Sequence, residues 1–179
     1  ASQLAIQIVN YLVTRLLTPI ALPKMSFEKS GIPDEYRTLV VVPLLWVDES
    51  TVDEEIDKLE IRYLANPHTN LMFGLFGDFT DAKDQTSPED ETLIERAVKG
   101  IEALNQRYGR GRFFLFHRER SWCETEGKFI GKERKRGKLE LLNGLIDGET
   151  LEENIVRIGQ AEALANVRFV ITLDSDTQL

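Results

Sequence analysis

The chain has 179 residues, of which 42% are hydrophobic and 29% are charged, as expected for one ordinary globular domain. Its net charge of −8 argues against nucleic-acid binding, because phosphate contacts require clustered Lys and Arg. The single cysteine excludes an internal disulfide framework, and no Cys/His cluster indicates a zinc site.

Cysteine use fits a reducing, cytoplasmic environment. The sequence contains no signal peptide and no apolar run of about 20 residues, so no membrane span is predicted. It begins without Met and stops directly after a candidate site turn. We therefore expect a piece of a longer protein.

Residues 4–17 predict an amphipathic helix, because polar residues recur on one face while the remainder is apolar. This apolar surface packs against a core or partner, or lies on a membrane surface; both alternatives stay open. Pro19 and Pro23 end the helix. We expect a helix and connector over residues 1–35 and an α/β unit over residues 36–179. The polar stripe consists of Gln3, Gln7, Asn10 and Thr14.

Apolar runs at residues 39–46, 71–79 and 112–117 predict strands buried on both faces. Pro43 is expected to mark the carboxyl end of the first, where a missing N–H costs little. Two helices are predicted between these runs. The first, residues 48–65, should direct Ile56, Leu59, Tyr63 and Leu64 to the sheet; the second, residues 87–108, should begin with Ser87 as N-cap and Pro88 at its first position.

Asp78 comes at the end of the second run and Asp81 follows it, both in the segment Gly-Asp-Phe-Thr-Asp-Ala. They belong either to a crevice at the sheet edge or to a loop of turn-forming residues. The segment 128–138 is rich in Lys and Arg between glycines. It is either a solvated helix start or a loop that enters a helix at residues 137–143, where phosphate binds. Residues 149–165 predict a further helix or helical loop.

Residues 167–173 predict a buried parallel strand. It ends in Asp174-Ser175-Asp176, and paired acids repel unless a cation or hydrogen-bond donors hold them. Oxygen ligands suit Mg²⁺ or Mn²⁺. The alternative is a solvated turn that contains two aspartates.

The predicted order is β-α-β-α-β-α-β, a doubly wound, mostly parallel sheet with helices on both faces. The chain lacks both a Gly-x-Gly-x-x-Gly signature after the first strand and a P-loop. A Mg²⁺-dependent phosphatase would place Asp-x-Asp-x-Thr after an early strand. Here the strand comes late and Gln178 stands where that Thr belongs, so this alternative is less favoured.

With these segments assembled, the chain resembles the glycosyltransferase domain of bacterial cyclic β-1,2-glucan synthases, large inner-membrane proteins with a GT-A-like nucleotide-sugar domain. The resemblance covers nearly the whole chain. Its most specific blocks are Glu-Arg-Lys-Arg-Gly-Lys-Leu-Glu at 133–140 and Val-Ile-Thr-Leu-Asp-Ser-Asp-Thr-Gln-Leu at 170–179. Further blocks are Leu-Pro-Lys at 22–24, Thr-Leu-Val-Val-Val-Pro at 38–43, Phe-Gly-Asp-Phe-Thr-Asp-Ala at 76–82, and Asn143.

The resemblance implies a donor site for UDP-glucose in a truncated GT-A-like sheet. Uracil and ribose would lie at the end of the first strand and beside Asp78. The diphosphate would lie near the basic residues, and the metal would be bound by the Asp-x-Asp pair. The implied nucleotide-sugar-binding residues are Val42, Pro43, Asp78, Arg134, Arg136, Lys138 and Asp174, and the implied metal ligands are Asp174 and Asp176, with Mg²⁺ or Mn²⁺.

It also implies an inverting transfer of glucose to a growing β-1,2-glucan chain, with the general base outside this chain and the isolated fragment inactive. The remainder of a full-length membrane protein would be its partner, at the cytoplasmic face of the bacterial inner membrane, with residues 4–17 beside the membrane. A non-catalytic interaction or regulatory α/β module is the alternative function.

Overall fold

The computed structural model describes residues 2–17, 27, 30–149, 155–159 and 161–175. The chain divides into two compact units, Ala1–Ser30 and Gly31–Leu179. The first unit contains the predicted N-terminal helix as α1 (Ser2–Leu16). The second contains every other element, and each unit is described by itself.

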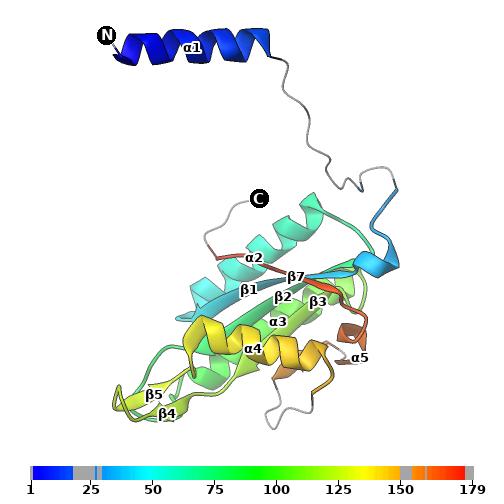
Figure 1. The fold of residues 1–179 in the computed structure, drawn as a ribbon. Helices are drawn as coiled ribbons and strands as arrows, with labels where there is room; N and C mark the ends of the chain where they lie inside the picture. The colour runs from blue at the N-terminus through cyan, green and yellow to red at the C-terminus, as the bar shows by residue number, and fades with distance from the viewer. Residues whose placement is uncertain (1, 18–26, 28–29, 150–154, 160, 176–179) are drawn as a thin grey trace. The chain divides into compact units, whose positions relative to one another are not determined.

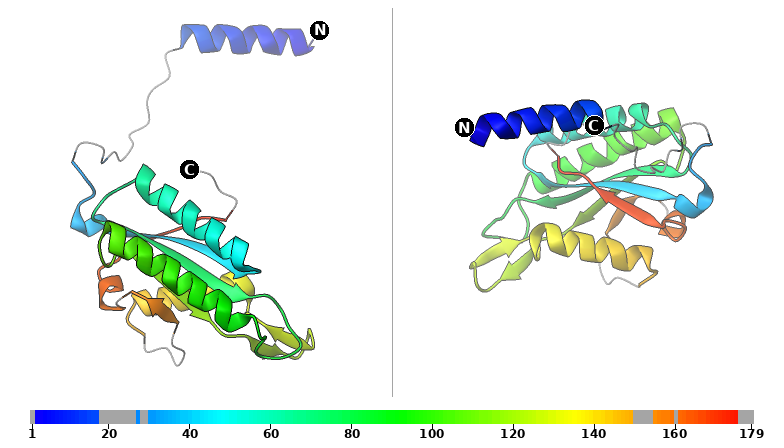
Figure 2. Two further views of the ribbon diagram at one scale, coloured as in Figure 1. Left: turned by 180° about the vertical axis from the view of Figure 1, so that it is seen from behind. Right: turned by 45° about the horizontal axis from the view of Figure 1, so that its top comes forward.

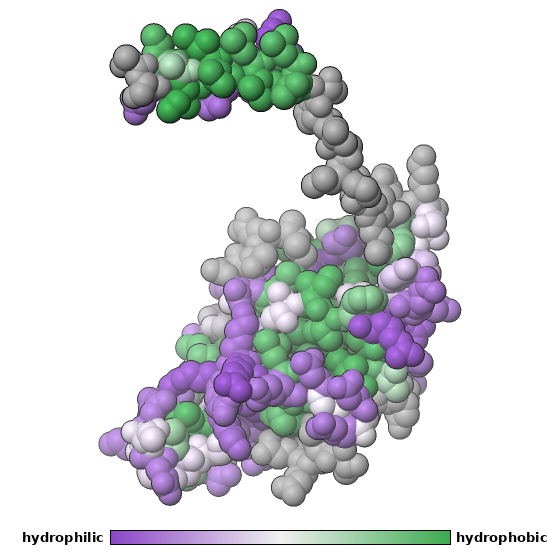
Figure 3. Space-filling model, in the orientation of Figure 1, coloured by the Kyte–Doolittle hydropathy of each residue, from purple (hydrophilic) through white to green (hydrophobic). Residues whose placement is uncertain are grey.

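Helix α1 exposes a broad apolar surface (Figure 3). It carries the predicted polar stripe, but its apolar side chains are all about half exposed or more. In the part of the chain that the structure describes, no helix is long and apolar enough to cross a membrane. The exposed apolar side chains are Leu4, Ile6, Ile8, Val9, Tyr11, Leu12, Val13, Leu16 and Leu17.

The second unit is built on a five-stranded sheet in the order β6-β3-β2-β1-β7 (Figure 1). Four neighbouring strands run parallel, and β6 (Val156–Ile158) pairs antiparallel with β3. The predicted doubly wound, mostly parallel α/β fold is confirmed. The parallel strands are β1 (Thr38–Trp46), β2 (Leu71–Phe79), β3 (Phe113–Arg118) and β7 (Phe169–Thr172).

Helices cover both faces of the sheet (Figure 2). On one face lie α2 (Glu49–Ala65) and α3 (Asp90–Tyr108), and on the other lie α4 (Arg134–Ile146) and α5 (Ala161–Leu164). Alternate β1 residues enter the two cores: Val40 and Val42 join the α2/α3 core, whereas Leu39 and Val41 join the other. Short elements complete the unit, namely the 3₁₀ turn η1 (Asp34–Tyr36) and a hairpin of β4 (Ser121–Cys123) and β5 (Lys128–Ile130).

Pro43 does not end the first strand, contrary to the prediction, because β1 continues to Trp46. The pairing of β1 with β7 stops at Val41 and Thr172, and the Val41 carbonyl accepts from the Leu173 N–H at 3.0 Å. Residues two apart direct their backbone polar groups to the same side of a strand. The missing N–H of Pro43 therefore falls just beyond this pairing, where it interrupts no ladder hydrogen bond.

The predicted helix or helical loop at residues 149–165 is wrong for residues 156–158 and right for residues 161–164. Residues 156–158 form β6, and the His117 N–H donates to the Ile155 carbonyl at 2.9 Å. Of the residues described in this range, only 161–164 are helical, as α5. The open edge of β3 supplies a partner, and such tertiary pairing outweighs local helix preference.

Three smaller predictions are corrected. Helix α3 begins at Asp90, whose carboxylate accepts from the Ser87 N–H at 2.8 Å, so Ser87 and Pro88 lie before the helix. Leu64 is exposed on α2 rather than buried against the sheet. Strand β7 is an edge strand with Phe169 and Ile171 half exposed, not a strand buried on both faces.

Candidate functional site

A pocket of about 440 Å³ opens where the carboxyl ends of β1 and β2 meet α2, α4 and the turn after β7. We call it the edge pocket. Because ligands of open α/β sheets bind outside the carboxyl ends of the strands, this is the expected place for a site. Its apolar wall consists of Pro43, Leu44, Leu45, Val47 and Phe79. Its charged side chains are Glu55, Asp78, Asp81, Arg134, Lys135 and Lys138.

Asp78 is a buried ion-pairing residue inside β2, only 2% exposed, and not a residue of the loop that follows. Arg118, its parallel neighbour on β3, donates to both carboxylate oxygens at 2.7 and 2.9 Å. The Lys138 ammonium lies 3.3 Å from Oδ2. A bidentate guanidinium–carboxylate contact of this kind fixes the orientation of both side chains. Asp78 therefore positions two cations, Arg118 and Lys138, at the floor of the pocket.

Lys138 ties α4 to the strand ends. Its Nζ donates to the Leu44 carbonyl at 2.5 Å and to the Phe76 carbonyl at 3.4 Å, besides facing Asp78. Burial lowers the pKa of this ammonium, and the Asp78 carboxylate opposes that shift. Its three donors are therefore directed at three protein acceptors.

The turn into α4 contains two residues in the left-handed backbone region. Glu133 and Arg134 both have positive φ, 53° and 50°, a conformation that is strained for such residues and is often found at functional sites. The Arg134 carbonyl accepts from Arg118 at 2.7 Å. Helix α4 begins at Arg134, so Gly137 and Lys138 lie about one turn inside it. The predicted helix entry at residue 137 is therefore wrong.

Gly131 lets this turn approach the buried pair closely. A Cβ at Gly131 would lie 2.7 Å from the Asp78 carboxyl carbon and 3.2 Å from Arg118 Nη2. Such separations are shorter than van der Waals contact allows. Gly131 therefore serves close packing at the site.

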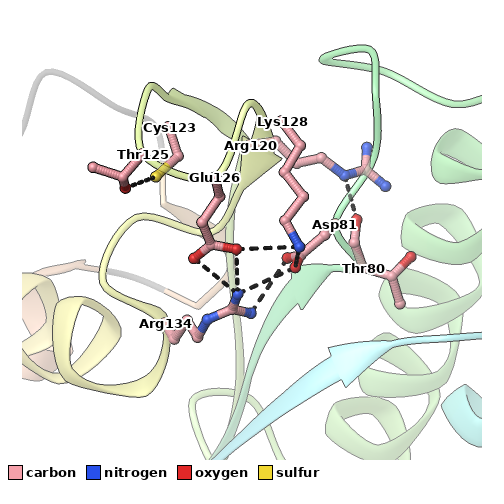
Figure 4. A network of polar contacts seen from close by, with 8 residues as sticks. All are labelled: Thr80, Asp81, Arg120, Cys123, Thr125, Glu126, Lys128 and Arg134. Atoms are coloured by element: carbon pink, nitrogen blue, oxygen red, sulfur yellow. Dashed lines mark hydrogen bonds and ion pairs between the residues drawn. The ribbon is translucent and has the colours of Figure 1, made fainter.

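Arg134 joins a network of two cations and two carboxylates beside the pocket (Figure 4). It lies 3.2 Å from Asp81 and 3.0 Å from Glu126, while Lys128 lies 2.8 Å from Asp81 and 3.1 Å from Glu126. The hydrogen bond from Lys128 is the main cause that lowers the pKa of Asp81 and of Glu126. The network connects the β4–β5 hairpin to α4.

Lys135 forms an ion pair with Asp174, which lies just after β7. Both side chains are at least half exposed, and Lys135 lines the edge pocket. Asp176, the second predicted metal ligand, lies outside the described residues. Among the residues that the structure does describe, no cluster of three or more His, Cys, Asp or Glu side chains is arranged to hold a metal ion.

The residues named from the sequence separate into two groups. Pro43, Asp78, Arg134 and Lys138 line the edge pocket, and Asp174 contacts it through Lys135. Val42 is instead fully buried in the core on the α2/α3 side, and Arg136 is exposed and pairs with Glu133 and Glu140 on its own turn and helix. The structure thus brings five of these residues to one place and leaves two outside it.

Two charged residues of the site, Glu55 and Arg118, were not singled out from the sequence, whereas Lys135 belongs to the predicted basic segment. Glu55 lies on the buried side of α2 with Val52 and Leu59. An acid at helical spacing among apolar residues was the available signal. Arg118 gave no signal, since its importance depends on the register that places it opposite Asp78.

Comparison with known proteins gives one informative relative. No family model matches the chain. The chain is 41% identical, over 182 aligned positions, to cyclic β-(1,2)-glucan synthase NdvB from Rhizobium meliloti. The alignment spans the whole of this chain but only 6% of that relative. The resemblance drawn from the sequence is confirmed, and the chain is similar to a small part of a glucan synthase.

Proposed function

We propose that this chain forms the donor-nucleotide part of an inverting, UDP-glucose-dependent glucosyltransferase that builds cyclic β-1,2-glucan. The observation that carries the proposal is the edge pocket, where cations from α4 meet carboxylates at the strand ends. Similarity to the glucan synthase supports the substrate class.

The two sides of the edge pocket suit the two ends of a nucleotide sugar. Arg134 and Lys135 stand at its α4 side and are partly exposed, so they are available to an anionic diphosphate. Pro43, Leu45 and Val47 offer an apolar wall for a base. Lys138 acts mainly as a positioning residue, because its ammonium is held by Leu44, Phe76 and Asp78.

Asp174 and Asp176 are proposed to hold Mg²⁺ or Mn²⁺. Their oxygen atoms are the ligands these ions prefer, and Asp174 already attracts a cation, the ammonium of Lys135. A bound ion would neutralise charge on the diphosphate as UDP leaves. Asp78 and Arg118 fix the floor against which the nucleotide is oriented.

Inversion at the sugar requires a general base that removes the acceptor proton. We assign that base, and the site for the growing glucan, to the remainder of a longer protein, so the isolated chain transfers no glucose. The proposed setting is the cytoplasmic face of a bacterial inner membrane, with α1 beside the bilayer, as its exposed apolar surface allows.

Calorimetric titration with UDP, with and without Mn²⁺, tests the proposal. We expect metal-dependent binding that is lost in an Asp174→Ala/Asp176→Ala variant and retained in Asp57→Ala, an exposed acid on α2 that does not line the pocket. No UDP binding by this chain or by an extended chain would refute the proposal and favour the interaction module.

A further inference from the structure

The edge pocket is lined by a residue with one buried carboxylate oxygen that has no hydrogen-bond partner in the part of the chain that the structure describes. Glu55 lines the pocket from α2 and is only 3% exposed. Its Oε1 accepts from Lys58 at 2.7 Å, but its Oε2 has no hydrogen-bond partner among the described residues. Buried polar atoms are nearly always paired, so an exception inside a pocket calls for an explanation.

The other buried carboxylate of the pocket is already fully used. Both oxygens of Asp78 accept hydrogen bonds from Arg118, and Lys138 faces one of them. Asp78 therefore offers little to a ligand unless this cluster opens. Of the two acids, only Glu55 has a carboxylate oxygen without a partner among the described residues.

The position of Glu55 restricts what that ligand group can be. Glu55 and Thr51 line the pocket from α2, whereas Arg134 and Lys135 line it from α4, which covers the opposite face of the sheet. A carboxylate repels phosphate, so phosphates belong on the α4 side. A metal ion at Glu55 is disfavoured, because no cluster of acidic ligands accompanies it within the described residues.

We propose that Glu55 is a nucleoside-binding residue of the edge pocket: its Oε2 accepts a hydrogen bond from an N–H or hydroxyl group of the nucleoside, while the phosphates lie toward Arg134 and Lys135. This inference rests on the proposed nucleotide-sugar site and adds a residue and an orientation to it. In a nearly dry setting, a hydrogen bond to a charged acceptor discriminates strongly between ligands.

Titration of the chain with UDP and Mn²⁺ tests this role in Glu55→Gln, which keeps the size of the side chain. We expect UDP affinity to fall about tenfold, as for one charge-assisted hydrogen bond, and pyrophosphate affinity to stay unchanged. Glu54→Gln is the matched control, since Glu54 is its exposed neighbour on α2.

UDP analogues give a second test, whose first step uses the unaltered chain alone. Among 2′-deoxy-UDP, 3′-deoxy-UDP and N3-methyl-UDP, one should bind the unaltered chain about tenfold more weakly than UDP, and that loss should vanish in Glu55→Gln. Unaltered affinity for all three analogues, or equal UDP affinity in Glu55→Gln and Glu54→Gln, would overturn the role of Glu55 alone. Weaker binding of UDP-glucose by Glu55→Gln, together with unchanged binding of UDP, would also overturn it. No UDP binding by the unaltered chain or by an extended chain would refute both proposals.

Discussion

Lys135 on α4 pairs with Asp174 just after β7, so the basic segment 128–138 and the Asp-Ser-Asp motif meet at the mouth of one pocket. The pair joins segments that are 39 positions apart in the sequence. Because both side chains are at least half exposed, the pair contributes little to stability. Because Lys135 lines the edge pocket, the pair suits a role in ligand binding better than a role in stabilising the fold.

Replacing Lys135 should therefore affect binding and not stability. We expect Lys135→Ala to change the free energy of unfolding by less than about 0.5 kcal/mol, but to weaken UDP binding several-fold, because one cation is removed from the phosphate side. Calorimetry and urea denaturation measure the two effects. Arg136→Ala is the matched control, since Arg136 lies outside the pocket; an equal loss of affinity in both variants would contradict this assignment.

Asp78 should behave in the opposite way, as a residue on which the fold depends. Asp78→Asn leaves Arg118 and Lys138 buried without their anionic partner. Breaking such a pair from one side costs about 3–5 kcal/mol, which urea denaturation would register. Glu95→Gln, which breaks an exposed pair with Lys99, should cost less than about 0.5 kcal/mol. A small effect for Asp78→Asn would show that the buried cations find other partners.

The sequence was sufficient to predict the sheet, because apolar runs and helical periodicity are local signals. Leu39–Trp46 and Leu71–Phe79 read as strands without knowledge of the fold. The β6 segment was missed, since its strand conformation depends on the free edge of β3. The role of Pro43 was predicted wrongly for the same reason, because whether a proline is tolerated inside β1 depends on where the pairing with β7 stops.

At the site, the sequence could identify charged residues but not their pairing. Asp78 and Lys138 were expected to face a ligand, yet the structure turns them toward Arg118 and toward backbone carbonyls. Helical spacing could have placed Glu55 on the buried side of α2, but the lack of a partner for its Oε2 among the described residues is a property of packing that leaves no local pattern in a sequence.

Gly131 offers a test of how closely the α4 turn must approach Asp78. A methyl group there would press on the carboxylate and on Arg118. We expect Gly131→Ala to lower the free energy of unfolding by about 1–3 kcal/mol and also to weaken UDP binding. Gly127→Ala is the control, since Gly127 has positive φ but open space around a Cβ. That variant should lose stability alone, and full UDP affinity in Gly131→Ala would contradict the close fit.

The network of Asp81, Glu126, Lys128 and Arg134 should make stability depend on pH. Its cations hold the carboxyl pKa of Asp81 below 3.8 and that of Glu126 below 4.5, their ordinary values. Because each pKa is lower in the folded chain than in the unfolded one, ionised carboxylates stabilise the fold above these values. That stabilisation is lost as the pH falls through the lower, folded pKa.

We therefore expect Asp81→Asn to lower the urea midpoint at pH 7, and the difference from the unaltered chain to narrow as the pH falls from about 5 to about 2. Added salt should reduce this difference in urea midpoint at neutral pH, because the charged network is partly exposed. Glu124→Gln changes an exposed acid of the β4–β5 hairpin. This control should have the same urea midpoint as the unaltered chain at every pH. A difference that stayed constant across this range would mean that Asp81 stabilises the hairpin by packing and not by its charge.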